Sequence, residues 1–152
     1  MPRRKSSPRL ENFDHLGPIA AHLIFVTRQR VSLFTDPAAA RICRSALLEA
    51  AEKLNANIHA YCLMPDHVHV LAEVGGGASI TEFARRFKLL SGYRLKQHTG
   101  EFAWQVSFGD HVLRREEALL DVARYIWENP VKEGLAADWR DYPHSGPREL
   151  MG

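Results

Sequence analysis

The sequence contains no long hydrophobic run, few cysteines and little excess charge, and each scarcity excludes a class of protein. No apolar stretch approaches the ~20 residues that a membrane-spanning helix needs, and no apolar segment follows the basic residues 1–5 as it would in a secretory signal. The two cysteines, Cys43 and Cys62, lie in apolar contexts, which favours buried thiols in a reducing compartment over a disulfide framework. We therefore predict a cytoplasmic protein without membrane association.

The length and composition of the chain indicate one globular domain. Of its 152 residues 45% are hydrophobic and 25% are charged, which suffices for one ordinary core. The polar start of the chain contains two prolines and ends beside Gly17–Pro18, so we expect an arm that precedes the fold. The predicted division is a basic arm at 1–17, a folded domain at 18–143 and a tail at 144–152.

The small net charge of +2 conceals an uneven distribution of basic residues. Residues 1–9 carry four basic side chains and no acid, and residues 80–98 carry five against one acid. Such clusters are typical of a surface that binds a phosphate backbone. The same pattern also fits a solvated helix face and a frayed terminus, so charge alone leaves both interpretations open.

The order of predicted elements indicates an α+β fold. Asp36 and Pro37 form a helix start, and a short turn at 64–66 makes the strands on either side of it a hairpin. The expected elements are strands at 19–27, 57–63, 67–74 and about 106–112, and helices from Pro37, from about Ser79 and from about Arg115. This order predicts the split βαβ arrangement of a ferredoxin-like antiparallel sheet, with helices on one face and the first and third strands central.

His67 and His69 are separated by Val68 on the third predicted strand. Side chains two residues apart on a strand point to the same face, so the two imidazoles can bind one divalent cation together. A pair of this kind is a weak signal, because surface or hydrogen-bonded histidines explain most such pairs.

Tyr125 and Asn129 lie on the last predicted helix. At about 100° per residue, a spacing of four places them on one flank of the helix, beside its apolar stripe. Pro130 disfavours helical geometry at the residue before it, so we expect the helix to end at Asn129. The alternative interpretation makes Tyr125 a half-buried boundary residue and Asn129 a helix stop.

Three motifs in order give the chain a specific resemblance to a known family. They are Met64–Pro65–Asp66 followed by His67–Val68–His69, Trp104 with the later Phe108–Val112, and Tyr125–Leu135. Over most of its length, from the first strand to about Tyr142, the chain resembles the REP-associated tyrosine transposases. These belong to the His-hydrophobic-His superfamily of single-strand nucleases, in the branch with one catalytic tyrosine. The glycine that usually follows the first strand in this family is not evident near residues 27–30.

The resemblance implies an endonuclease and strand transferase that acts on single-stranded DNA at palindromic repeats folded into hairpins. Tyr125 matches the nucleophile, which would form a 5′-phosphotyrosine, and His67, His69 and Asn129 match the metal ligands. Two imidazoles and an amide oxygen accept Mg²⁺ or Mn²⁺. Resemblance to this branch also favours a monomer over a dimer.

The basic clusters then become the expected DNA-binding residues, with contacts to the hairpin and its backbone. The candidates are Arg3, Arg4 and Lys5 in the arm and Arg85, Arg86, Lys88 and Arg94 in the second helix. Two other functions remain open: a DNA-hairpin binding protein or repressor without catalysis, and a hydrolase in which water attacks and Tyr125 is structural.

Overall fold

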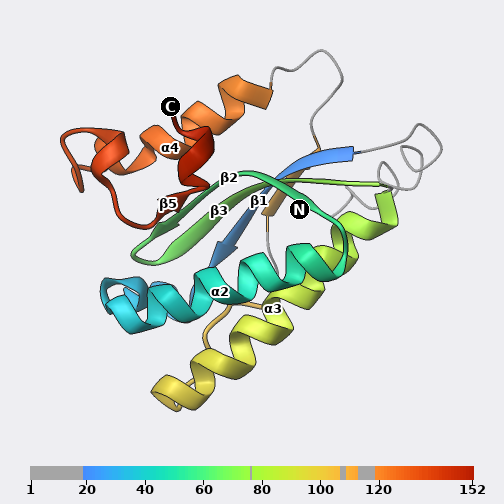
Figure 1. The fold of residues 1–152 in the computed structure, drawn as a ribbon. Coiled ribbons are helices and arrows are strands. Elements are labelled where there is room, and N and C mark those ends of the chain that lie inside the picture. The colour runs from blue at the N-terminus through green and yellow to red at the C-terminus, as the bar shows by residue number, and fades with distance from the viewer. Residues whose placement is uncertain (1–18, 76, 107–108, 113–118) are drawn as a thin grey trace.

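A computed structural model describes residues 19–75, 77–106, 109–112 and 119–152 (Figure 1). Within these residues the strands form one antiparallel sheet in the order β4-β1-β3-β2-β5. The strands are β1 (Ile19–Val26), β2 (Asn57–Met64), β3 (His67–Val74), β4 (Gly109–Val112) and β5 (Ser145–Gly146). The principal helices are α2 (Pro37–Lys53), α3 (Gly77–Thr99) and α4 (Leu119–Lys132).

This strand order confirms the predicted ferredoxin-like fold. The first four strands in sequence follow the split βαβ order, with β1 and β3 at the centre. The segment predicted as a tail adds β5 to the free edge of β2, where Tyr61 pairs with Gly146 and Cys62 with Ser145. The strand that carries the two histidines is therefore bordered on both sides by other strands.

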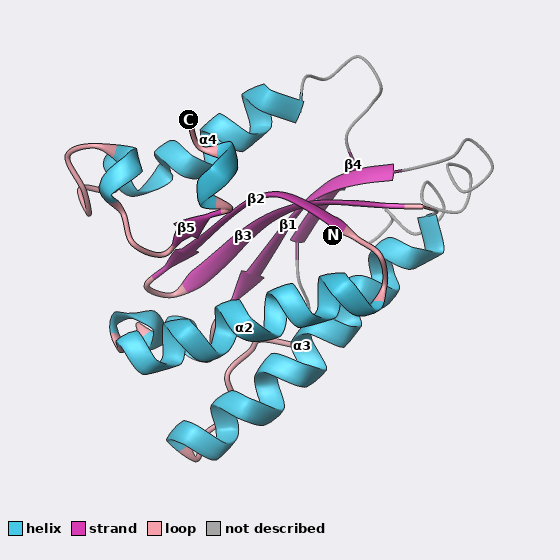
Figure 2. Cartoon of the chain, viewed as in Figure 1, coloured by secondary structure: helices cyan, strands magenta, loops and turns pink. Residues whose placement is uncertain are grey.

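The two faces of the sheet are covered by different helices (Figures 1 and 2). On one face, α2 and α3 pack against side chains such as Phe25, Val68 and Val70. On the other face, α4 packs Ile126 and Trp127 against a smaller cluster that includes Ala60, Cys62, Met64 and Leu71. Because residues alternate between the faces of a strand, His67 and His69 project toward α4 together with Leu71.

Several element starts and turns form as the sequence predicts. The Asp36 side chain accepts a hydrogen bond from the Ala38 N–H at 3.0 Å, and Pro37 is the first residue of α2. The β2–β3 hairpin closes where Met64 pairs with His67. β4 begins at Gly109, later than expected, and α3 starts at Gly77, before Ser79. The predicted start of the last helix near Arg115 lies outside the described residues.

The predicted end of the last helix at Asn129 is wrong, because α4 continues through Pro130 to Lys132. Proline has no backbone N–H, so Pro130 removes one hydrogen bond from the helix, but only two more helical residues follow it. The N–H groups of Glu133 and Leu135 bond to the carbonyls of Asn129 and Pro130 at 3.0 and 2.7 Å. Burial of Asn129 and Pro130 against the sheet therefore outweighs the local preference of a residue before proline.

Gly146 joins the edge strand to α4, because its carbonyl accepts a hydrogen bond from Trp127 Nε1 at 2.9 Å. A Cβ at this position would lie 2.5 Å from Tyr61 Oη and 2.6 Å from its Cζ. We expect Gly146→Ala to lower the free energy of unfolding by about 1–3 kcal/mol, measured by urea denaturation, because the buried Tyr61 ring has to shift. Gly75→Ala is the matched control, since a Cβ there meets nothing within 4 Å. Equal stability of the two variants would contradict the prediction.

Candidate active site

His67 and His69 stand side by side near the start of β3, with ring centroids 4.9 Å apart and ring planes at 75°. The His67 side chain keeps 19% of its surface exposed, whereas His69 is buried at 4%. The pair is thus open to solvent on the His67 side and enclosed by protein on the His69 side. The structure confirms that the spacing of the pair brings both rings to one place.

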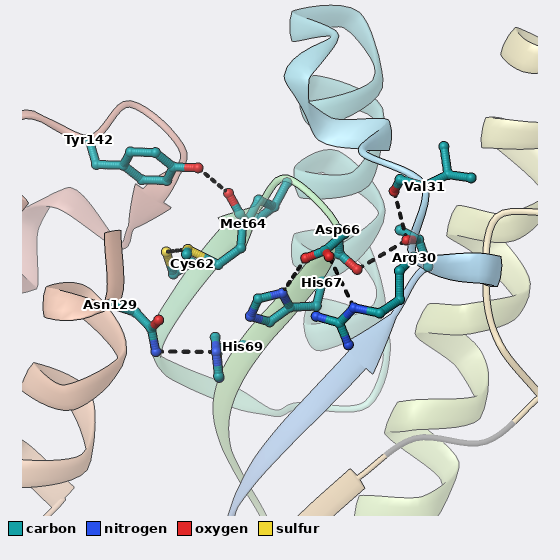
Figure 3. A network of polar contacts seen from close by, with 11 residues as sticks. Arg30, Val31, Cys62, Met64, Asp66, His67, His69, Asn129 and Tyr142 are labelled. Atoms are coloured by element: carbon teal, nitrogen blue, oxygen red, sulfur yellow. Dashed lines mark hydrogen bonds and ion pairs between the residues drawn. The ribbon is translucent and has the colours of Figure 1, made fainter. Parts of the chain in front are cut away.

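His69 is held between β1 and α4 by both of its ring nitrogens. Nδ1 lies 2.9 Å from His22 Nε2, and Nε2 lies 3.4 Å from Asn129 Nδ2 (Figure 3). An amide nitrogen only donates, so His69 Nε2 accepts this weak bond, and Nδ1 carries the proton that it donates to His22. The arrangement selects one tautomer of His69, with the lone pair of Nε2 directed at α4.

Burial and, to a smaller extent, charge repulsion from the neighbouring His22 and His67 lower the pKa of His69 to about 3. The ring is therefore neutral at physiological pH. A neutral imidazole with a lone pair on Nε2 is the form that binds a metal ion.

Asp66 links His67 to the loop that follows β1. Its Oδ1 accepts from His67 Nδ1 at 2.7 Å and its Oδ2 accepts from Arg30 Nε at 3.1 Å (Figure 3). Partial burial raises the pKa of Asp66, but the His67 hydrogen bond and the Arg30 charge outweigh it, and the pKa stays below its usual value. His67 is therefore held as His69 is, through Nδ1, which leaves Nε2 for a ligand.

Tyr125 on α4 brings its phenol ring to the same histidines within one chain. The ring lies edge-on to His69 with centroids 6.4 Å apart, and 6.1 Å from His22. Lys132 Nζ lies 5.0 Å from the centroid of the phenol ring. Tyr125 is 47% exposed, so solvent and a large substrate can reach it.

The donor set fits a divalent cation in an open site. Two imidazoles and the terminal amide of Asn129, whose Nδ2 lies 3.4 Å from His69 Nε2, converge on one region. In the described part of the chain no three side chains of His, Cys, Asp or Glu gather as a metal cluster, so a closed structural centre of those ligands is not formed there. Three ligands of mixed type leave positions for water and for a phosphate oxygen, as in catalytic sites.

The predicted DNA-binding residues on α3 lie across the sheet from this site, since α3 and α4 cover opposite faces (Figure 1). Arg85 and Arg86 are exposed. Lys88 Nζ donates to the carbonyls of Gln105 and Val106 at 2.7 and 3.0 Å, and burial lowers its pKa. Arg94 pairs with Glu49 at 2.9 Å. The predicted contacts Arg3, Arg4 and Lys5 lie outside the described residues.

Sequence reasoning missed three side chains that adjoin the histidine pair, namely His22, Asp66 and Arg30. His22 has a detectable signal, because it alternates with the buried residues Ala21 and Leu23 and so faces α4. Asp66 belongs to the motif Met64–Pro65–Asp66, but the sequence identifies it only as a turn residue. Nothing in the sequence indicates that the Arg30 side chain forms a hydrogen bond with the Asp66 carboxylate.

Comparison with protein families and curated proteins gives consistent results. The model of the IS200-like transposase family matches residues 17–129. A Haemophilus influenzae protein provisionally named a REP-associated tyrosine transposase is 28% identical over 115 residues, which cover 67% of this chain and 65% of that protein. The REP-associated tyrosine transposase of Escherichia coli is 26% identical over 109 residues, covering 69% of this chain and 62% of that protein. The matched segments thus span somewhat less than two thirds of either relative.

Solved structures give the same fold. A REP-associated tyrosine transposase bound to a REP hairpin superposes with a TM-score of 0.72 at 22% identity, covering 86% of this chain and 78% of that one. A Deinococcus radiodurans protein provisionally identified as a transposase gives a TM-score of 0.56 at 25% identity, covering 74% of this chain and 90% of that one. In the part of the chain that the structure describes, no helix has the length and apolar character to span a bilayer.

The burial of His69 has a measurable consequence in the metal-free protein. Because its pKa is about 3 when folded, against an ordinary 6.5, we expect nitrogen-15 NMR to show a neutral ring with protonated Nδ1 throughout the mildly acidic range. In that range the unfolded chain binds the extra proton, so the free energy of unfolding falls as the pH drops from the ordinary value toward the folded one. His69→Gln should remove that part of the loss. A His69 signal that titrates near its ordinary pKa would contradict the assignment.

Proposed function

Because the chain belongs to the IS200-like transposase family, we propose that it is a metal-dependent enzyme that cuts and rejoins single-stranded DNA beside hairpins formed by palindromic repeats. The observation that carries the proposal is the position of Tyr125, an exposed phenol whose ring lies 6.4 Å from the ring of buried His69. The proposed nucleophile and metal-binding side chains then lie together between the sheet and α4.

The chain's own residues prepare the site before DNA arrives. His22 and Asp66 hold the two imidazoles through their Nδ1 atoms, so the lone pairs on both Nε2 atoms can serve as ligands, that of His69 in exchange for its weak bond to Asn129 Nδ2. α4 delivers Tyr125 and Asn129 together, and the packing of Ile126 and Trp127 against the sheet keeps this helix in register. A Mg²⁺ or Mn²⁺ ion held by His67, His69 and Asn129 would polarise the scissile phosphate and neutralise the charge that develops on it.

The covalent step follows from the chemistry of a phenol. Tyr125 Oη attacks the scissile phosphorus and loses its proton, and the bond from phosphorus to the 3′ oxygen breaks. The products are a 5′-phosphotyrosine and a free 3′-hydroxyl. Attack of another 3′-hydroxyl on the phosphotyrosine reverses the step and joins new ends, so rejoining needs no nucleotide cofactor.

The nucleophile can be tested with a labelled hairpin oligonucleotide that carries a single-stranded flank. In Mn²⁺ or Mg²⁺ the wild-type protein should form an adduct that survives denaturation, and Tyr125→Phe should form none, because it lacks the attacking oxygen. Tyr93→Phe is the matched control, an exposed tyrosine on α3. His67→Ala should also lose the adduct while it retains hairpin binding in a gel-shift assay.

The outcomes of this assay separate the competing functions. Tight hairpin binding by the wild type without any adduct would select a DNA-hairpin binding protein or repressor. Repeated cleavage without an adduct, equally fast in Tyr125→Phe, would select hydrolysis by water. An adduct in Tyr125→Phe as strong as in the wild type would show that another residue is the nucleophile.

The site is complete within one chain, which supports a monomeric enzyme. A mixture of Tyr125→Phe and His67→Ala proteins should therefore form no adduct, because neither chain holds both intact groups. A dimer that exchanges its α4 helices would rebuild one intact site from the two variants. Recovery of the adduct in the mixture, together with a dimeric size in gel filtration, would contradict the monomer.

A further inference from the structure

The loop after β1 is held against Asp66 in a conformation that costs free energy. Gln29 and Arg30 have φ angles of 57° and 54°, the left-handed region that side chains with a Cβ rarely adopt. A conformation of this kind persists only where the surrounding contacts impose it, and it is often found at functional sites.

Three hydrogen bonds to Asp66 impose this conformation. The backbone N–H and the side-chain hydroxyl of Thr27 both donate to the Asp66 carbonyl at 3.0 Å, and Arg30 Nε donates to the Asp66 carboxylate at 3.1 Å. Thr27 is buried at 1%, and its single hydroxyl hydrogen is shared between the Asp66 carbonyl and the Val31 carbonyl, whose oxygen lies 2.8 Å from Oγ1. The loop therefore has a defined shape, with Arg30 directed toward the start of β3 (Figure 3).

The guanidinium of Arg30 is only partly used by this arrangement. Nε is bound to Asp66, whereas Nη1 and Nη2 have no hydrogen-bond partner among the residues that the structure describes. The side chain is 60% exposed. The two terminal nitrogens of an arginine form a fork that matches two oxygens of a phosphate, and a lysine cannot replace it.

Asp66 connects this fork to a metal-binding histidine. Its two carboxylate oxygens bind His67 Nδ1 and Arg30 Nε, so one side chain fixes the position of both groups. We propose that Arg30 binds a phosphate of the DNA strand at the active site, and that Asp66 is the positioning residue that sets this anchor relative to His67. This inference rests on the proposed function, because it assigns a substrate contact in the same site.

The alternative is an ordinary surface ion pair, which contributes little to stability and nothing to DNA binding. Arg28 and Lys96 show the contrast. They lie over the ring of Phe102, with the Arg28 Cζ at 5.7 Å and the Lys96 Nζ at 4.2 Å from its centroid. Arg30 alone among these three basic residues shares a carboxylate with a candidate metal ligand.

The first test measures single-turnover adduct formation by Arg30→Gln. We expect a loss of about 10- to 100-fold, the range for a hydrogen bond to a charged group, with unchanged thermal stability. The affinity of the metal-free protein for Mn²⁺, measured by electron paramagnetic resonance, should stay within a few-fold of the wild type. Arg41→Gln, which removes an exposed charge from α2, should form the adduct at the wild-type rate. Equal rates for both variants would overturn the proposal.

A second test identifies the phosphate. Oligonucleotides that carry one neutral methylphosphonate at successive positions around the cleavage point remove one phosphate charge at a time. At the position that Arg30 contacts, the wild type and Arg30→Gln should react equally fast, because the interaction is already lost. A constant ratio of the two rates at every position would overturn the contact.

A third test separates the two roles of Asp66. Asp66→Asn keeps an oxygen for His67 Nδ1 but offers no second acceptor to Arg30, so it should lower the rate without loss of Mn²⁺ affinity, and add little to Arg30→Gln. Asp66→Ala should also weaken Mn²⁺ binding. Full additivity of Asp66→Asn with Arg30→Gln would contradict the shared role. A wild-type protein that forms no adduct would instead refute the proposed function itself.

Discussion

The buried imidazole of His69 is the constraint on which the rest of the site depends. Its two nitrogens contact β1 and α4 through His22 and Asn129, so one ring joins the centre of the sheet to the helix that carries Tyr125. Burial without a charge partner keeps the ring neutral. Burial of His69 between β1 and α4 therefore keeps the imidazole neutral, as a metal ligand must be, and also positions the phenol of Tyr125 relative to the sheet.

The alternation of β3 divides structural and chemical roles between the two faces of one strand. Val68 and Val70 pack under α2 and α3 in the larger core, while His67 and His69 face α4. The smaller cluster around Ile126 and Trp127 surrounds the site and holds α4 in place.

Much of this architecture is predictable from local patterns. The runs of strand formers, the Asp36 cap and the turn at 64–66 identify the elements, and their order identifies the split βαβ sheet. The prediction that α4 ends at Asn129 fails because a local proline rule ignores the burial of that turn. Charge and family resemblance together predict that the basic residues of α3 bind DNA, but neither reveals that α3 covers the opposite face of the sheet from α4.

The sequence by itself determines that His67 and His69 share a face and that Tyr125 and Asn129 share a flank, because the periods of strand and helix are local properties of the chain. Only the tertiary structure decides that the histidine face of β3 meets the Tyr125 flank of α4, which tautomer His69 adopts, and that Arg30 bonds to Asp66. His22 and Asn129 lie 47 and 60 positions from His69, and Arg30 lies 36 positions from Asp66. Contacts over such separations arise from packing, which no local period encodes.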